Sequence, residues 1–231
     1  MELSVILPTY NEKENIEEMI NRVDNVCKKN KISAEIIVVD DKSPDGTAGI
    51  VRRMIKKKKN LRLIVRQKRE GLGAAVFHGY RKAKGKIIGS SDSDLSIDPK
   101  YIPAIYKKLQ SGYDVVIGSR YMAGANVVGK PTHKVWASKG AALLASIILD
   151  MNLHDYTLNF RFFKRKVLPK KLTATGNVML AEFLYVTNRN GFKIGEVPIT
   201  FVERKKGKSK MKLGKEMFFG LLEMLKLRFR H

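Results

Sequence analysis

Residues 36–41 of the chain read Ile-Ile-Val-Val-Asp-Asp, an uninterrupted apolar run that ends in two aspartates. An apolar run without polar alternation is typical of a strand that is buried on both faces of a parallel sheet. In open α/β sheets, ligands bind beyond the carboxyl ends of the strands. This stretch therefore predicts a buried parallel sheet and places an acidic pair at its ligand-binding edge.

The sequence on either side of this strand alternates between two kinds of pattern. Continuous apolar runs predict further strands at residues 4–7, 61–65, 87–90 and 115–118. Apolar residues at spacings of three and four predict helices from Asn11, from Ser43, at 74–83 and from Asp98 to about Leu109. We expect Asn11 to cap the first of these helices and Ser43 the second. The alternation is typical of an α/β fold with a mostly parallel central sheet flanked by helices.

Beyond Tyr121 the pattern is less regular. It predicts a loop at 124–132, a helix at 138–149, a strand or bend at 160–163, a helix at 178–188 and one strand at 192–201 that bends near Pro198. Residues 215–230 have an apolar side with flanking lysines and arginines, which suits either a helix in the plane of a membrane or a helix that packs on the domain. The simplest organisation is one domain at 1–214 and a C-terminal amphipathic helix at 215–231.

Composition excludes several classes of protein. The 231 residues are 44% hydrophobic, which is enough for a packed core and excludes wholesale disorder. One cysteine cannot form an internal disulfide, and the four histidines have no metal-ligand spacing. No apolar stretch approaches the roughly 20 residues of a membrane-spanning helix, and no secretory signal is visible, so we expect a cytoplasmic protein. The net charge of +23 is compatible with nucleic acid, an anionic membrane surface or phosphorylated ligands.

Polar clusters follow four of the predicted strands, and a parallel sheet would bring them to one edge. They are Pro8-Thr9-Tyr10-Asn11-Glu12, Asp40-Asp41, Asp92-Ser93-Asp94 and Ser119-Arg120. In an extended segment, carboxylates two residues apart lie on the same side, so Asp92 and Asp94 could share a divalent cation and bind a diphosphate through it. Each cluster also has a purely structural explanation as a turn or helix cap. Their common position favours a ligand site, in which Tyr10 could stack on a ring and Glu12 and the Asp40-Asp41 pair could accept hydrogen bonds.

Taken in order, the motifs of this chain resemble those of family 2 glycosyltransferases. The segments that carry the resemblance are 8–12, 38–41, 43–47, 71–73, 92–95 and 118–121. Within the family, Gly195-Glu196-Val197-Pro198 and the basic segment Arg204–Lys210 are similar to the dolichyl-phosphate mannose synthase branch. The resemblance spans about residues 3 to 215, and the ordered set is much more specific than any one motif.

The resemblance implies an A-type nucleotide-sugar glycosyltransferase fold and a hexosyltransferase that moves mannose from GDP-mannose to dolichyl (polyprenyl) phosphate with inversion. It places Pro8, Tyr10, Glu12, Val39 and Asp41 in the nucleotide pocket. It places Asp92, Ser93 and Asp94 in the metal and diphosphate motif, with Asp92 and Asp94 as ligands of Mg²⁺ or Mn²⁺. The phosphate-binding cations that it implies are Arg120, Arg204 and Lys210. A metal ion with Arg and Lys would neutralise the departing diphosphate, and an anionic acceptor phosphate needs no strong general base. We therefore assign Asp94, Arg120, Arg204 and Lys210 to catalysis and name no base.

Several positions depart from the family pattern. Ser93 replaces the usual alanine of the acidic motif, and Ser96 stands where some members have a ligating glutamine. Lys134 replaces an arginine, which keeps the charge but loses the two-pronged phosphate contact. Leu158-Asn159 replaces a segment with glycine and serine near the sugar or the acceptor, so the identity of the sugar stays open. Asp155 could orient the acceptor or have a structural hydrogen-bonding role.

Three alternatives remain beside this interpretation. The same fold could use a UDP-sugar such as UDP-glucose, or another acceptor. A basic nucleic-acid-binding protein is a different class, but no recognition module is visible and acidic strand ends would repel phosphate, so no nucleic acid is expected. A catalytically silent scaffold would have no need of the full set of charged residues. We expect the enzyme to associate peripherally with the cytoplasmic face of a membrane, through its surface or a small membrane-protein partner, and the loop at 204–210 to close over the donor.

Overall fold

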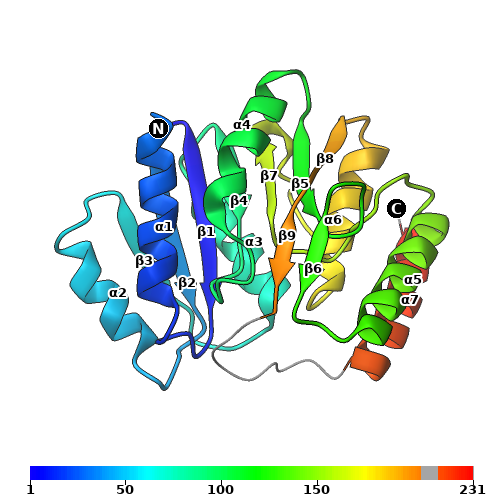
Figure 1. The fold of residues 1–231 in the computed structure, drawn as a ribbon, viewed down its shortest axis with the longest axis horizontal. Helices are drawn as coiled ribbons and strands as arrows, with labels where there is room; N and C mark the ends of the chain where they lie inside the picture. The colour runs from blue at the N-terminus through cyan, green and yellow to red at the C-terminus, as the bar shows by residue number, and fades with distance from the viewer. Residues whose placement is uncertain (204–212, 231) are drawn as a thin grey trace.

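The computed structural model describes residues 1–203 and 213–230, with side chains in the last segment from residue 219 onward. A central sheet runs through the molecule and helices cover both of its faces (Figure 1). Its strands are β1 (Leu3–Thr9), β2 (Ala34–Asp40), β3 (Leu61–Val65), β4 (Ile87–Ser90), β5 (Val115–Ser119), β7 (Arg161–Lys164) and β8 (Ile194–Pro198). The described helices are α1 (Ile16–Lys29), α2 (Thr47–Ile55), α3 (Leu72–Lys82), α4 (Ile102–Gln110), α5 (Thr132–Leu149), α6 (Val178–Arg189) and α7 (Leu213–Arg230), with short 3₁₀ turns at Pro99–Tyr101 and Arg165–Val167.

The order of strands in this sheet is β3-β2-β1-β4-β7-β5-β8. All neighbouring pairs are parallel except those of β7, which is antiparallel to both β4 and β5. A second, two-stranded sheet pairs β6 (Asn126–Val128) with β9 (Thr200–Val202). The prediction of a mostly parallel sheet flanked by helices is therefore confirmed, and the antiparallel insertion of β7 adds the segment before residue 161 to the middle of the carboxyl edge.

Two hydrophobic cores lie on opposite faces of the sheet. One packs α1, α2 and α4 against strands β1, β2 and β4, and the other packs α3, α5, α6 and α7. The 3.6-residue spacing seen in the sequence accounts for the first core, because Ile16, Met19, Ile20 and Val23 of α1 are all fully buried. Strands β1 and β2 are buried on both faces, as their continuous apolar runs predict, whereas β3 at the edge of the sheet is mostly half-buried.

Both expected helix caps are wrong. The first helix begins at Ile16, and Asn11 lies five residues earlier in the left-handed region with φ of 60°. The second begins at Thr47, and Ser43 binds the carboxylate of Asp40 instead, donating from its backbone nitrogen at 2.9 Å and from its hydroxyl at 2.6 Å. Each predicted cap thus belongs to a longer loop at the carboxyl edge, since local side-chain hydrogen bonds compete with helix capping.

The second half differs from prediction at two further places. The predicted loop at 124–132 contains β6, and helix α5 begins at Thr132, six residues before the expected start. The predicted single strand at 192–201 is two strands, β8 and β9, which belong to different sheets because the chain changes direction beside Pro198. Helix α7 contacts α5 and α6, and its Met224 and Leu227 are buried. No helix among the described residues is both long enough and apolar enough to cross a bilayer.

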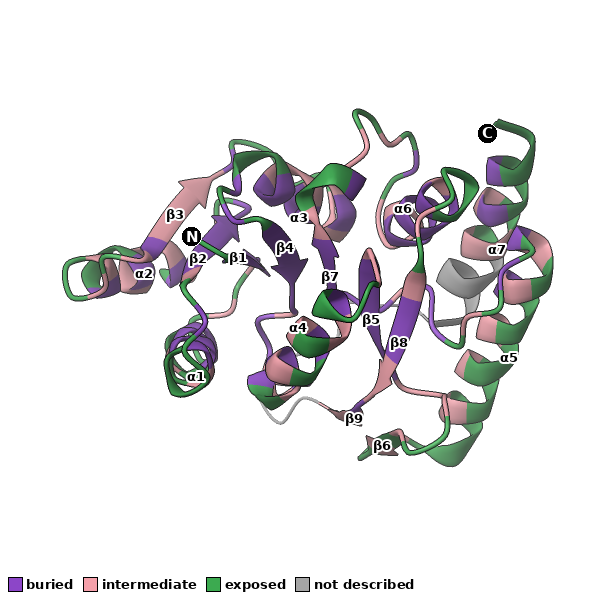
Figure 2. Ribbon diagram, turned by 90° about the horizontal axis from the view of Figure 1, so that it is seen from above, coloured by how far each residue is buried: buried purple, intermediate pink, exposed green. Residues whose placement is uncertain are grey.

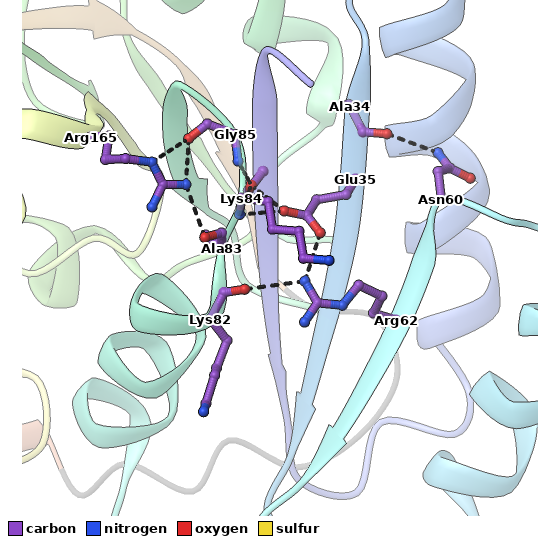
Figure 3. A network of polar contacts seen from close by, with 10 residues as sticks. Ala34, Glu35, Asn60, Arg62, Lys82, Ala83, Lys84, Gly85 and Arg165 are labelled. Carbon is purple, nitrogen blue, oxygen red and sulfur yellow. Dashed lines mark hydrogen bonds and ion pairs between the residues drawn. The ribbon is translucent and has the colours of Figure 1, made fainter.

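A saturated polar network joins the elements at the amino ends of the strands (Figure 3). Glu35, at the start of β2, accepts hydrogen bonds from the hydroxyl of Ser4 at 2.7 Å, from Arg62 at 2.8 Å and from the backbone nitrogen of Lys84 at 2.6 Å. Arg165 donates to the carbonyl oxygens of Ala83 and Gly85 in the same turn. The network holds the connection between α3 and β4 against strands β1 and β2.

Candidate active site

Two loops interlock at the carboxyl edge, the one that follows β1 and the one that follows β2. The backbone nitrogen of Glu12 donates to Thr47 Oγ1 at 3.0 Å, and that of Lys13 donates to Asp45 Oδ2 at 3.1 Å. Asp45 also accepts from both the backbone nitrogen and the hydroxyl of Thr47. Polar residues that are 32 to 35 positions apart in sequence therefore form one rigid border of the site.

The two aspartates at the end of β2 have different surroundings. Asp40 is a structural residue, since it accepts hydrogen bonds from Thr9 and from both donors of Ser43. Asp41 is buried, and its Oδ1 lies 3.3 Å from Nε of Arg66 but has no hydrogen-bond partner among the described residues. Burial raises the pKa of the Asp41 carboxyl, although the positive charge of Arg66 opposes the shift. The Nη1 atom of Arg66 is likewise buried without a hydrogen-bond partner, so the pair combines a buried acceptor with a buried donor.

Three other residues of the predicted nucleotide pocket have different surroundings. The guanidinium of Arg69 covers the Tyr10 ring at 4.1 Å from its centre, so stacking of a base on that face would displace Arg69. Glu12 Oε2 accepts a hydrogen bond from Asn15. The side chain of Val39 is fully buried in the core on the face of the sheet that α3 covers.

The acidic motif follows β4 and is held by contacts to two other segments and by one contact within its own loop. Asp92 Oδ1 accepts a hydrogen bond from Asn159 Nδ2 at 3.1 Å, and the hydroxyl of Ser93 donates to the carbonyl oxygen of Pro8 at 2.8 Å. Asp94 Oδ1 accepts from the backbone nitrogen of Ser96 at 3.0 Å. Because each residue has its own tether, the two carboxylates are fixed in position independently of any ligand.

This acidic loop is also attached to the strand that leads into the basic segment. The carbonyl oxygen of Ser96 accepts from the backbone nitrogen of Val202 at 2.9 Å, and Ile97 forms a β-bridge with Phe201. Arg204 and Lys210 lie outside the described residues. The last contacts described between this strand and the acidic loop are therefore those of Phe201 and Val202.

Arg120 follows β5 and forms a bidentate ion pair. Its Nε and Nη2 lie 2.7 and 2.9 Å from the two carboxylate oxygens of Asp155. Burial alone would lower the pKa of Arg120, but Asp155 outweighs it and raises that pKa above its usual value. Arg120 also lies over the Phe201 ring, whose centre is 5.7 Å away, and Lys130 lies 4.5 Å from the same centre. Of the two roles considered for Asp155, these contacts favour the structural one.

Comparison with known proteins identifies the family. The sequence profile described as "Glycosyl transferase family 2" matches residues 4–171. The chain belongs to glycosyltransferase family 2. It is 36% identical over 230 residues to a dolichol-phosphate mannosyltransferase of Pyrococcus furiosus, covering 98% of this chain and 64% of that protein. It is 33% identical over 215 residues to a polyprenol monophosphomannose synthase of Mycolicibacterium smegmatis, covering 90% of this chain and 80% of that protein.

A solved structure confirms the A-type fold of this family 2 glycosyltransferase. Glucosyl-3-phosphoglycerate synthase from Mycobacterium tuberculosis, in complex with Mn²⁺, UDP and phosphoglyceric acid, aligns with a TM-score of 0.71 over 97% of this chain and 78% of that chain. The two sequences are 22% identical, so the likeness concerns the fold. The expected A-type architecture is thus confirmed independently of the motifs.

The donor set of this glycosyltransferase fits a hard divalent cation. Asp92 and Asp94 offer carboxylate oxygens, the ligands that Mg²⁺ and Mn²⁺ prefer. Across the described part of the chain, no group of three or more His, Cys, Asp or Glu side chains could hold a metal ion. Mg²⁺ is commonly bound through one or two carboxylates and completed by substrate phosphates. Two tethered carboxylates therefore suit a cation that arrives with, or is completed by, a diphosphate.

The structure brings four residues that sequence reasoning did not assign into contact with predicted site residues or their neighbours. They are Arg66, Arg69, Lys130 and Asn159. Arg66, Arg69 and Lys130 could not be recognised in the sequence, because the chain is rich in Lys and Arg and no spacing distinguishes these three. Asn159 was noted only as a departure from the family pattern, and its contact with Asp92 spans 67 residues of sequence. Only the folding of β7 beside β4 brings that pair together.

Proposed function

We propose that this glycosyltransferase transfers mannose from GDP-mannose to a polyprenyl phosphate such as dolichyl phosphate. The names of the two relatives support the acceptor and the sugar. The observation that supports GDP as the nucleotide of the donor is the buried Asp41–Arg66 pair. A guanine edge presents N–H donors beside a carbonyl acceptor, so Asp41 Oδ1 would accept from the base and Arg66 Nη1 would donate to its carbonyl.

The chemistry that we propose is one displacement with inversion. An oxygen of the acceptor phosphate attacks C1 of mannose, the bond from C1 to the diphosphate breaks, and GDP leaves with the electron pair. The attacking oxygen is already anionic, so no side chain needs to remove a proton. Asp92 and Asp94 would hold Mg²⁺ or Mn²⁺, and the bound cation would supply positive charge to the departing diphosphate.

The chain's own cations complete the proposed charge balance. Arg120 already shares its charge with Asp155, so it would act as an oriented hydrogen-bond donor more than as an uncompensated charge. Arg204 and Lys210 would bring further positive charge to the phosphates from the segment that follows β9. Because their places lie outside the described residues, their closing over the donor remains part of the proposal.

Transfer of label from GDP-mannose, UDP-glucose and UDP-N-acetylglucosamine to a short polyprenyl phosphate tests this function. The expected result is a mannolipid formed from GDP-mannose only, with Mg²⁺ or Mn²⁺ and not with EDTA. Transfer from a UDP-sugar alone would overturn the donor assignment, and unchanged transfer in EDTA would overturn the metal assignment. Tight RNA binding at physiological salt without donor binding would reverse the choice of class.

We further propose that α5 and α7 dock on an anionic membrane surface, where a lipid acceptor would be found. Exposed residues run along both helices at one side of the molecule (Figure 2). The large apolar side chains on this face are Trp136, Leu143, Leu144 and Ile147 of α5 and Phe219, Leu222, Leu225 and Phe229 of α7. Exposed cations flank them at Lys134, Lys139, Arg228 and Arg230. Apolar side chains bordered by Lys and Arg are typical of helices that lie in a lipid interface.

Sedimentation with vesicles of phosphatidylglycerol and of phosphatidylcholine tests this surface. The double variant Leu143→Glu, Ile147→Glu should lose at least tenfold in partitioning to the anionic vesicles, because it places two charges in the apolar layer. Val128→Glu is a matched control, since Val128 is an exposed apolar residue that belongs to β6 and to neither helix. Equal partitioning of the double variant and the control, or no wild-type binding to either vesicle, would overturn the proposal in favour of a protein partner.

A further inference from the structure

We propose that Asn159 is a positioning residue for Asp92, and that it sets the affinity of the site for a divalent cation bound with the donor diphosphate. The inference rests on the proposed function, because it takes Asp92 to be a metal ligand. Asn159 itself touches neither substrate nor metal in this account. It acts through the carboxylate that it holds.

A buried chain of hydrogen bonds leads from the core to Asp92. Tyr80 Oη lies 2.6 Å from Ser90 Oγ, and Ser90 Oγ donates to Asn159 Oδ1 at 2.6 Å. Asn159 Nδ2 then donates to Asp92 Oδ1 at 3.1 Å. Tyr80, Ser90 and Asn159 are each at most 2% exposed, so water does not compete for these contacts.

The direction of every proton in this chain is determined. Ser90 has one hydroxyl proton and gives it to Asn159, so Tyr80 must donate to Ser90. Burial raises the pKa of Tyr80 to about 12, which keeps its phenol protonated at neutral pH. A flipped amide would turn its oxygen toward the Asp92 carboxylate, and the two acceptors would repel each other. All three donors therefore point toward Asp92, and the bonds of such a chain strengthen one another.

The backbone that carries Asn159 is rigid. Arg161 is fully buried, and its guanidinium donates to the carbonyl oxygens of Tyr156, Leu158 and Leu180. At the start of the same segment, Asp155 holds Arg120. Residues 155–161 thus fix both an acidic and a basic member of the site, and β7 anchors them by pairing with β4 and β5.

A neutral amide suits this position better than a cation would. An amide donor orients one oxygen of Asp92 without itself adding a positive charge beside the carboxylate. A lysine or arginine there would bring a positive charge beside the proposed metal ligand and oppose the binding of a cation. Partners that orient metal ligands commonly account for 10- to 100-fold in metal affinity.

Titration of Mn²⁺ in the presence of GDP, followed by the electron paramagnetic resonance of free Mn²⁺, tests the assignment without turnover. We expect Asn159→Ala to raise the Kd for Mn²⁺ about tenfold. Binding of GDP in EDTA should change less than twofold, because the proposed base pocket is elsewhere. Asn60→Ala is a matched control, since Asn60 donates to Asp24 at the same 3.1 Å but at the other end of the sheet. It should lower the melting temperature and leave Mn²⁺ affinity unchanged.

Ser90 and Tyr80, which precede Asn159 in this series of hydrogen bonds, give a second and graded test. Ser90→Ala should raise the Kd for Mn²⁺ about threefold and Tyr80→Phe by less, because each leaves the contact between Asn159 and Asp92 in place. If Asn159→Ala does not fold, Ser90→Ala decides the matter. Wild-type affinity in the folded variant would overturn the positioning role while the proposed function stands. Failure of the wild type to bind Mn²⁺ with GDP would overturn the metal assignment itself.

Discussion

Two buried carboxylates near opposite ends of strand β2, Glu35 and Asp41, have pKa shifts of opposite direction. Glu35 at the amino end accepts from Ser4, Arg62 and Lys84, and these hydrogen bonds outweigh desolvation and lower its pKa. Asp41 at the carboxyl end is desolvated without enough compensation, and its pKa is raised. Equal burial therefore gives a stabilising charge at one end and a costly one at the other. The difference separates a group that serves the fold from one that the proposed function assigns to the nucleotide.

The same contrast holds for polar atoms generally. Among the described residues, the buried side-chain atoms without hydrogen-bond partners are Asp41 Oδ1, Arg66 Nη1 and Ser96 Oγ. All three belong to segments that leave the carboxyl edge of the sheet. Unsatisfied buried polar groups cost about 1–3 kcal/mol each, so they persist where another requirement maintains them. The amino end, with its saturated network, has no such requirement.

The largest effect is expected at the acidic motif. Asp94→Asn should lower the turnover number by about 10³-fold, because it removes a charge from the proposed metal site while keeping the acceptor for Ser96. The melting temperature should stay within a few degrees, since no core contact changes. Measurement of mannosyl transfer and of thermal unfolding on the same preparation checks both. Activity within tenfold of the wild type would remove Asp94 from the mechanism.

The next effect tests the amino end of β2. Glu35→Gln should lower the free energy of unfolding by about 2–3 kcal/mol, because hydrogen bonds to a buried charge are lost. Glu35 has a lowered folded pKa, so its contribution is fully present above its ordinary value of 4.5 and is lost as pH falls through the lowered one. The difference between wild type and variant in urea unfolding should therefore shrink in acid. A difference in free energy of unfolding that stayed constant down to pH 3 would contradict this prediction. The kcat of the variant should equal that of the wild type.

At the carboxyl end of β2, a substitution should change the affinity for GDP without lowering the stability of the fold. Asp41→Asn should weaken GDP binding about tenfold to thirtyfold and yet not lower stability at neutral pH. The pKa of Asp41 is raised in the fold, so its ionised form costs stability as pH rises through that raised value, above the ordinary 3.8. Calorimetric titration with GDP and urea unfolding at pH 7 measure the two effects. A clear loss of stability would show that the ion pair with Arg66 serves the fold.

The smallest effect concerns the isolated hydroxyl beside the acidic motif. Ser96→Ala should raise the free energy of unfolding by about 0.5–1 kcal/mol, since it removes a buried hydroxyl that has no partner. Thermal unfolding of the two proteins at one pH is sufficient to detect it. A destabilisation of 1 kcal/mol or more would instead mean that this hydroxyl is hydrogen-bonded in solution.

The first half of the fold could be predicted from sequence because its signals are local. Runs such as residues 61–65 and 87–90 correspond residue for residue to β3 and β4. Helix starts were less accurate, because Asn11 and Ser43 have the chemistry of caps but bind across loops instead. In the second half, the register of β7 and the division of residues 192–201 between two sheets depend on partners that no local pattern names.

The sequence by itself determined the order of strands and helices, the acidic clusters at strand ends and the resemblance to the family, because periodicity and motif order are properties of neighbouring residues. Only the tertiary structure decided which buried charges are satisfied. It paired Asp155 with Arg120, placed Asn159 against Asp92 and left Oδ1 of Asp41 beside Arg66 without a hydrogen bond. These outcomes depend on distances between segments that are 25 to 67 residues apart, and such distances exist only once the sheet has formed.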